Sequence, residues 1–139
     1  MTSLIKSKER VKDLGEVFTP ESLVFKMLEK LPSSAWEKNR TFLEPSCGTG
    51  NILIAIFTNK IKHGSTPLEA LSTIYGIDIM KDNVKESRKR LLNAALENSL
   101  NLSQINIAVD LIKKNIVLGN ALEIDLEKLW KKDFEADNN

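Results

Sequence analysis

The stretch FLEPSCGTGN, residues 42–51, joins an apolar run to the start of a helical pattern. The run TFLE (41–44) is typical of a short strand, and NILIAIFTNKIKHG (51–64) is apolar on most sides, as expected of a largely buried helix. Between them, Gly48 and Gly50 let the main chain approach a ligand closely, and a helix start offers free N–H groups. The sequence therefore predicts a strand, a glycine turn and a helix in direct succession.

Outward from this turn, strands alternate with helices along the chain. YGIDI (75–79) and IVLGNAL (116–122) predict two further strands, the first of the near-continuous apolar kind found in parallel sheets. Helical patterns precede and follow these strands along the chain, and two of the patterns begin with the helix-start signal Thr-Pro. The patterns cover residues 19–32, 65–74, 81–99, 102–115 and 125–132. This order predicts an α/β fold with a parallel sheet and right-handed crossovers.

The composition of the chain excludes several classes of protein. The 139 residues are 42% hydrophobic and 28% charged, which suits one modest domain with a core. No apolar run approaches the roughly 20 residues of a membrane span, and MTSLIKSKER lacks the apolar segment of a secretory signal. One cysteine and one histidine exclude an internal disulfide and a zinc cluster and favour a reducing, cytoplasmic location. The net charge of +1 does not by itself indicate nucleic-acid binding.

Two polar features place a ligand beyond the carboxyl ends of the strands, where parallel sheets bind theirs. The glycine turn follows the first strand, and Asp78 ends the second. A carboxylate in that place can accept both hydroxyls of a ribose. The pair therefore indicates a cofactor that contains a nucleoside.

The turn lacks the sequence features of two common classes of nucleotide-binding site. A dinucleotide fingerprint needs a third glycine where this chain has Leu53, and no Gly-Lys-Ser/Thr of a P-loop occurs. Glu44 adds a negative charge that repels phosphates and suits a cationic ligand with an amino group. S-adenosylmethionine (SAM) carries both a sulfonium and an ammonium group.

Four segments in this order and spacing resemble the SAM-binding half of adenine-specific DNA amino-methyltransferases: GEVFTPESLVFKML, FLEPSCGTGNILI, YGIDI and IVLGNAL, within residues 15–125. The resemblance implies a partial Rossmann-like methyltransferase fold with a three-stranded parallel sheet flanked by helices. It divides the chain into an N-terminal arm (1–14), a SAM-binding domain (15–132) and a polar tail (133–139).

The resemblance also implies roles for particular residues. Phe18, Thr19 and Pro20 would form a wall of the SAM pocket near its methionine end. Asp78 would bind the ribose hydroxyls, and Ile79 would pack on the adenine. Asn120 stands where the family often has an aspartate that contacts the adenine amino group. The amino-acid moiety of SAM would meet Glu44 and the backbone of the turn, which includes Pro45, Ser46, Gly48 and Gly50.

The family's catalytic motif, Asn or Asp followed by two prolines and an aromatic residue, does not occur in these 139 residues, where no two prolines are adjacent. In the family it holds and activates the flipped-out adenine. Two hypotheses follow. The chain is one portion of an enzyme whose partner supplies this motif and the DNA contacts, or it is a catalytically inactive SAM-binding or protein-interaction module. A third and weaker hypothesis is that the chain is a shortened form of a longer enzyme, which its polar ending disfavours.

A further expectation concerns the first strand, which the family pairs with a fourth strand. Without that strand, TFLE would lie at an edge of the sheet, and exposed apolar edges are usually covered. We therefore expect a homodimer or a second methyltransferase subunit at this edge, or the arm 1–14 folded over it.

Plainer interpretations stay open for several residues. The glycine turn could be only a tight connection, Asp78 a capping residue, Asn120 a turn residue and Thr19-Pro20 a helix start. Cys47 is expected to be a small loop residue with no nucleophilic role, and His63 a solvated side chain. The basic run KESRKR (85–90) is expected to form a solvated face, although it could contact DNA phosphates.

Overall fold

A three-stranded parallel sheet forms the centre of the molecule in the computed structural model, which describes residues 21–130. The strands are β1 (Phe42–Glu44), β2 (Ile74–Asp78) and β3 (Ile116–Leu118), and β2 lies in the middle. Glu44 is opposite Gly76, and Asp78 is opposite Leu118, so all three strands end at the same edge. The α/β class and the partial Rossmann-like arrangement expected from the sequence are confirmed.

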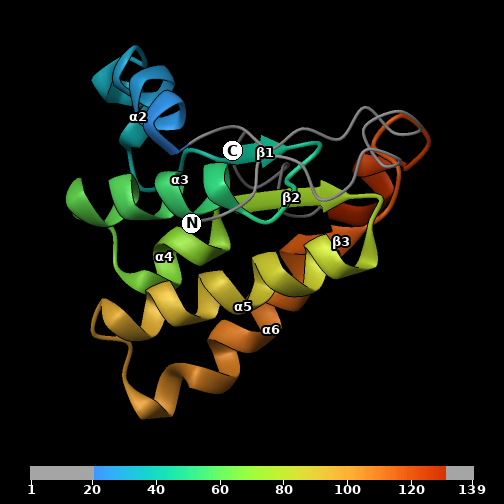
Figure 1. The fold of residues 1–139 in the computed structure, drawn as a ribbon. Helices are drawn as coiled ribbons and strands as arrows, with labels where there is room; N and C mark the ends of the chain where they lie inside the picture. Colours follow the sequence, from blue (N-terminus) through green and yellow to red (C-terminus); the bar gives the residue numbers. More distant parts are fainter. Residues whose placement is uncertain (1–20, 131–139) are drawn as a thin grey trace.

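The helices lie beside this sheet, and α3 and α5 run next to each other (Figure 1). A short 3-10 turn, η2 (Leu102–Gln104), precedes the helix that leads into β3, and residues 126–130 are helical. The α-helices of the described part are α2 (Glu21–Glu29), α3 (Asn51–Lys62), α4 (Pro67–Ser72), α5 (Lys81–Glu97) and α6 (Ile105–Asn115). None of the helices in this part is long and apolar enough to cross a membrane.

The sequence signals explain where α4 begins. Thr66 accepts a hydrogen bond from the backbone N–H of Glu69 at 3.2 Å, and the Glu69 carboxylate accepts one from the N–H of Thr66 at 2.9 Å. Pro67 occupies the first helical position, where its missing N–H costs nothing. The predicted Thr-Pro start is therefore confirmed at this helix.

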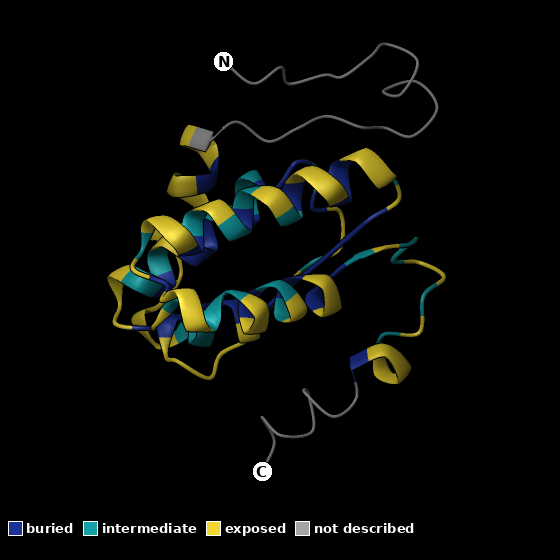
Figure 2. Ribbon diagram, turned by 90° about the horizontal axis from the view of Figure 1, so that it is seen from below, coloured by how far each residue is buried: buried dark blue, intermediate teal, exposed yellow. Residues whose placement is uncertain are grey.

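Both faces of the sheet are covered at its central strand, because every residue of β2 is buried. One face packs against α3 and α5 through a large apolar cluster that includes Leu53, Phe57 and Leu91. On the other face, Tyr75 and Ile77 pack with Trp130, whose ring lies 4.9 Å from that of Tyr75. Figure 2 shows a buried strand beside helices whose outer sides are exposed. A sheet covered on both sides is the usual state of parallel strands.

Several predicted boundaries were wrong by a few residues. The third strand ends at Leu118, and Gly119 to Leu122 form a turn instead of the rest of IVLGNAL. The 3-10 helix η1 (Ser33–Trp36) was not predicted; it places Trp36 in a stack with the Phe42 ring, 5.1 Å away. His63 is exposed as expected, yet its ring also stacks on Trp36. The arm 1–14, the residues Phe18, Thr19 and Pro20, and the tail 133–139 lie outside the described residues.

Strand β1 is an edge strand within residues 21–130, as expected, because it pairs only with β2 there. Its outward residue is Leu43, whose side chain is 38% exposed. The unpaired backbone groups of such an edge are a surface on which a further strand can pair.

Candidate functional site

The glycine turn lies at the carboxyl end of β1 and folds back toward β2. The N–H of Cys47 donates to the carbonyl of Ile77 at 2.8 Å. Gly48 and Gly50 have φ angles of +55° and +98°, which residues with a side chain rarely adopt. Gly50 is the N-cap of α3 and has no side chain, so no N-cap side chain accepts a hydrogen bond from the first N–H groups of that helix.

Asp78 anchors this turn from the end of β2. Its Oδ2 accepts a hydrogen bond from the N–H of Gly48 at 2.8 Å. Its Oδ1 accepts from the N–H of Met80 at 2.8 Å and from Nδ2 of Asn83 at 3.1 Å. The residue is only 5% exposed. A carboxylate offers about four acceptor positions, so three internal bonds leave one for a ligand; the ribose role of Asp78 stays a prediction.

Helix α5 holds the turn from the other side. Ser87 Oγ donates to the carbonyl of Gly48 at 2.8 Å. Arg90 Nη1 donates to the carbonyl of Thr49 at 2.9 Å and to Oδ1 of Asn51 at 2.7 Å. The expectation that KESRKR is a solvated face is therefore wrong for these two residues and for Arg88, which donates to the carbonyl of Ile116 at 2.8 Å.

Glu44 stands at the mouth of the turn, where β1 ends. It is half-buried, and its Oε1 accepts a hydrogen bond from the N–H of Ser46 at 3.1 Å. Burial raises the pKa of this carboxyl above its ordinary value of 4.5, and the bond from Ser46 opposes part of that rise. The neighbouring Pro45 and Ser46 are exposed. A carboxylate whose charge is poorly solvated gains from a nearby cation.

Cys47 has no nucleophilic character in this environment. Burial, the largest effect, raises the pKa of its thiol to about 12, and the hydrogen-bond contact with Ser87 offsets only part of it. The Sγ and Oγ atoms of the two residues are 3.8 Å apart. A thiol with such a pKa is protonated at neutral pH, so Cys47 acts as a packing residue of the turn.

The ends of β2 and β3 form a different kind of surface beside the turn. Ile79 and Leu118 are each 51% exposed, and Leu122 is 94% exposed. Asn120 uses its Oδ1 to accept a hydrogen bond from the N–H of Leu122 at 3.0 Å, which is the geometry of a turn residue. Its Nδ2 group remains available as a donor.

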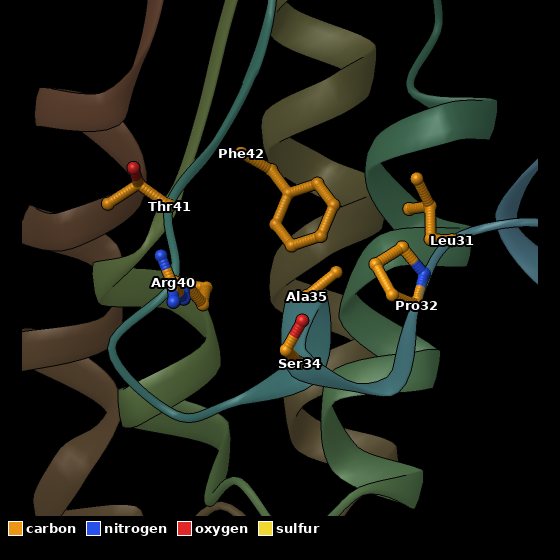
Figure 3. Close-up of a pocket in the computed structure, with 7 residues that line it drawn as sticks. All are labelled: Leu31, Pro32, Ser34, Ala35, Arg40, Thr41 and Phe42. Atoms are coloured by element: carbon orange, nitrogen blue, oxygen red, sulfur yellow. The ribbon is translucent and has the colours of Figure 1, made fainter.

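A pocket of about 330 Å³ lies at the opposite end of β1 (Figure 3). It is open and is lined by residues that precede or begin the strand: Leu31, Pro32, Ser34, Ala35, Arg40, Thr41 and Phe42. Because ligands of parallel sheets bind at the carboxyl edge, this amino-end pocket is separate from the candidate site.

Comparisons with known proteins show which family the chain belongs to. A family model described as N-6 DNA methylase matches residues 4–137. The chain belongs to this family of DNA methylases. It is also 36% identical over 77 residues to the Type II methyltransferase M.VspI of Vibrio sp. (strain 343), which covers 55% of this chain and 16% of that protein. No solved structure matches the chain.

For this N-6 DNA methylase chain, most residues predicted from the sequence gather at one edge of the sheet. The polar group comprises Glu44, Pro45, Ser46, Gly48, Gly50 and Asp78, and the neighbouring ends of β2 and β3 carry Ile79 and Asn120. Sequence reasoning missed Ser87 and Arg90. One signal could have found Ser87: it lies three residues after Val84 and four before Leu91, on the buried side of α5. No group of three or more potential metal ligands occurs within residues 21–130.

Proposed function

We propose that this domain binds SAM at the carboxyl edge of its sheet and serves as the cofactor-binding part of an adenine-specific DNA methyltransferase. The observation that carries the proposal is the glycine turn held between Asp78 and α5, beside an acidic side chain and an exposed apolar surface.

The polar end of the site suits the amino-acid part of SAM. Thr49 Oγ1 is buried and has no hydrogen-bond partner, which is unusual for a hydroxyl in a protein interior. The start of α3, which no side chain caps, favours a carboxylate through the helix dipole. Glu44, half-buried nearby in the chain, suits the ammonium group.

The apolar end suits the adenosine part. Asp78 retains one acceptor position for a ribose hydroxyl, and Ile79 and Leu118 offer exposed aliphatic surface on which an adenine ring would pack. Asn120 keeps its Nδ2 donor free for a ring nitrogen. These contacts would leave the sulfonium between the two ends.

Bound SAM would supply an electrophilic methyl group, and the residues of this chain would bind and orient it. Cys47 is protonated at neutral pH and takes no proton from a substrate. The group that activates an adenine, and the contacts to DNA, would come from another segment or a partner chain. The matched part of M.VspI is only 16% of that protein, so the domain corresponds to a fraction of that relative.

Calorimetry with the 139-residue chain tests this proposal. We expect SAM and its demethylated product to bind with a dissociation constant on the order of tens of micromolar, which corresponds to a binding free energy of about 6 kcal/mol. NAD and ATP should bind far more weakly, because Glu44 disfavours phosphates. Absence of heat with SAM at millimolar concentration would refute the cofactor assignment.

The open edge of β1 supports a second candidate function, an inactive SAM-binding or protein-interaction module. Under both candidates we expect β1 to be covered by a second copy of the chain, by a second methyltransferase subunit or by the arm 1–14. Light scattering of the pure chain shows a dimer in the first case and a monomer in the other two. Transfer of labelled methyl from SAM to DNA separates the candidates. The enzyme function predicts transfer only when the partner is added, and the inactive module predicts none with or without it.

A further inference from the structure

We infer that Ser87 and Arg90 of α5 are positioning residues, which hold the carbonyl groups of Gly48 and Thr49 so that the N–H of Thr49 faces the ligand. The inference rests on the proposed SAM site. Neither residue needs to touch the ligand, because both act through the backbone of Gly48 and Thr49.

Peptide geometry gives the first step. The C=O and N–H groups of one planar trans peptide point in opposite directions. Ser87 binds the carbonyl of Gly48, so the N–H of Thr49 in the same peptide unit points away from α5. Without that bond the peptide between Gly48 and Thr49 can rotate, since Gly48 tolerates a wide range of backbone angles.

Arg90 secures the junction of the turn with α3. Its Nη1 joins the carbonyl of Thr49 and the side chain of Asn51, the first residue of the helix. A guanidinium that donates to a carbonyl oxygen makes a charge-assisted bond, which is stronger than one between neutral groups. This contact ties the glycine turn to the first residue of α3.

The space between the turn and α5 shows how closely the two are fitted. A Cβ atom on Gly50 would lie 3.2 Å from Ser87 Oγ and 3.3 Å from Ser87 Cα. The latter atom belongs to the helix backbone, which yields less easily than the end of a flexible side chain. A side chain at position 50 would therefore be strained by its φ angle and crowded against Ser87.

Arg88 provides a matched control on the same helix. Its Nε donates to the carbonyl of Ile116 at 2.8 Å and its Nη2 to that of Lys113 at 3.2 Å, at the junction of α6 and β3. It makes the same kind of bond to backbone carbonyls, but it does not contact the glycine turn. A purely structural role of arginines on α5 would make the two residues equivalent.

The first experiment compares Arg90→Met with Arg88→Met in the full 139-residue chain, by thermal unfolding and by calorimetry with SAM. Both variants should lower the melting temperature by similar amounts. Arg90→Met should weaken SAM binding about tenfold, and Arg88→Met less than about twofold. Arg90→Lys, which keeps a charged donor, should recover part of the lost affinity. Equal losses of SAM affinity in the two methionine variants would overturn the inference.

The second experiment needs no ligand and so separates this inference from the proposed function. Amide hydrogen exchange in residues 46–53 should be faster in Arg90→Met and Ser87→Ala than in the unmodified chain, and unchanged in Arg88→Met. If SAM does not bind the unmodified chain, the proposed function fails while this comparison still decides whether α5 positions the turn. If Arg90→Met does not fold, Ser87→Ala and Arg90→Lys carry the same test. Unchanged exchange in both Arg90 variants and Ser87→Ala would contradict the inference.

Discussion

The carboxyl edge of the sheet has a polar part that is fixed by hydrogen bonds and an apolar part that is partly exposed. Beside β1 and β2, the glycine turn is held by hydrogen bonds from Asp78, Ser87 and Arg90. Beside β3, the residues Ile79 and Leu118 are half exposed and few polar contacts constrain them. Directional donors must be fixed before a ligand arrives, because a misaligned buried polar group costs about 1–3 kcal/mol. Apolar contact has no such requirement, since it depends on the area buried.

This difference predicts that changes at the polar part reduce stability and SAM affinity together. Changes at the apolar part should reduce affinity alone.

The largest effect is expected for Gly50→Ala, because φ is +98° and the new Cβ would press on the backbone of Ser87. Backbone strain and overpacking together should lower the free energy of unfolding by about 2–4 kcal/mol and abolish SAM binding. Gly64 is the control: its φ is +101°, but no atom lies within 4 Å of an added Cβ. Gly64→Ala should cost only about 1–2 kcal/mol and leave SAM affinity unchanged. Chemical denaturation measures both, and equal costs would show that the turn can move away from α5.

Asp78→Ala should have the second-largest effect on stability and SAM affinity. It removes the acceptor for the N–H groups of Gly48 and Met80 and for the Asn83 amide. Leaving these donors unpaired should lower the free energy of unfolding by about 2–3 kcal/mol, with a loss of SAM affinity of similar size. Asp110, an exposed carboxylate on α6, is the control and should change stability by less than about 0.5 kcal/mol when replaced by alanine. A variant that lost SAM affinity at unchanged stability would mean that Asp78 serves the ligand and not the turn.

Glu44 should give the polar part a dependence on pH. Because burial raises its folded-state pKa, its contribution to stability is full below pH 4.5 and is lost as the pH rises through that raised pKa. The ammonium group of SAM would lower this pKa again, so SAM affinity should increase over the same interval and binding should release protons just above pH 4.5. Calorimetry in buffers with different ionisation enthalpies measures the release, which Glu44→Gln should eliminate. Uptake of protons on binding would show that the ammonium group of SAM does not lie beside Glu44.

The smallest effects are expected at the apolar part. Ile79→Ala and Leu118→Ala should each weaken SAM binding about three- to tenfold, through lost burial against the adenine. Both side chains are 51% exposed, so unfolding free energies should change by less than about 1 kcal/mol. Leu102→Ala is the control, since that side chain is 87% exposed and lies in η2, away from the edge. A large loss of stability in Ile79→Ala would break the distinction between the two parts.

Much of the fold was predictable because its signals are local. The Thr66–Glu69 capping box, the apolar stripe with Val84 and Leu91 on α5, and the buried run of β2 each depend on a few neighbouring residues. The end of β3 was predicted too late, because Gly119 and Asn120 leave the sheet through a turn in which Asn120 bonds its own backbone. Helix η1 carried no clear signal, since its position depends on the packing of Trp36 against Phe42.

The sequence by itself determined the parallel α/β fold and the glycine turn at the end of β1, and it placed Glu44 and Asp78 at the ends of neighbouring strands. Periodicity, turn chemistry and the common direction of parallel strands suffice for that. Only the tertiary structure decided what holds the turn. Ser87 and Arg90 lie 39 and 41 residues from the carbonyl groups that they bind, and nothing in their own neighbourhood in the sequence specifies those partners. The contacts exist because α5 packs against α3 and brings these side chains beneath Gly48 and Thr49, where unpaired carbonyls would otherwise be buried.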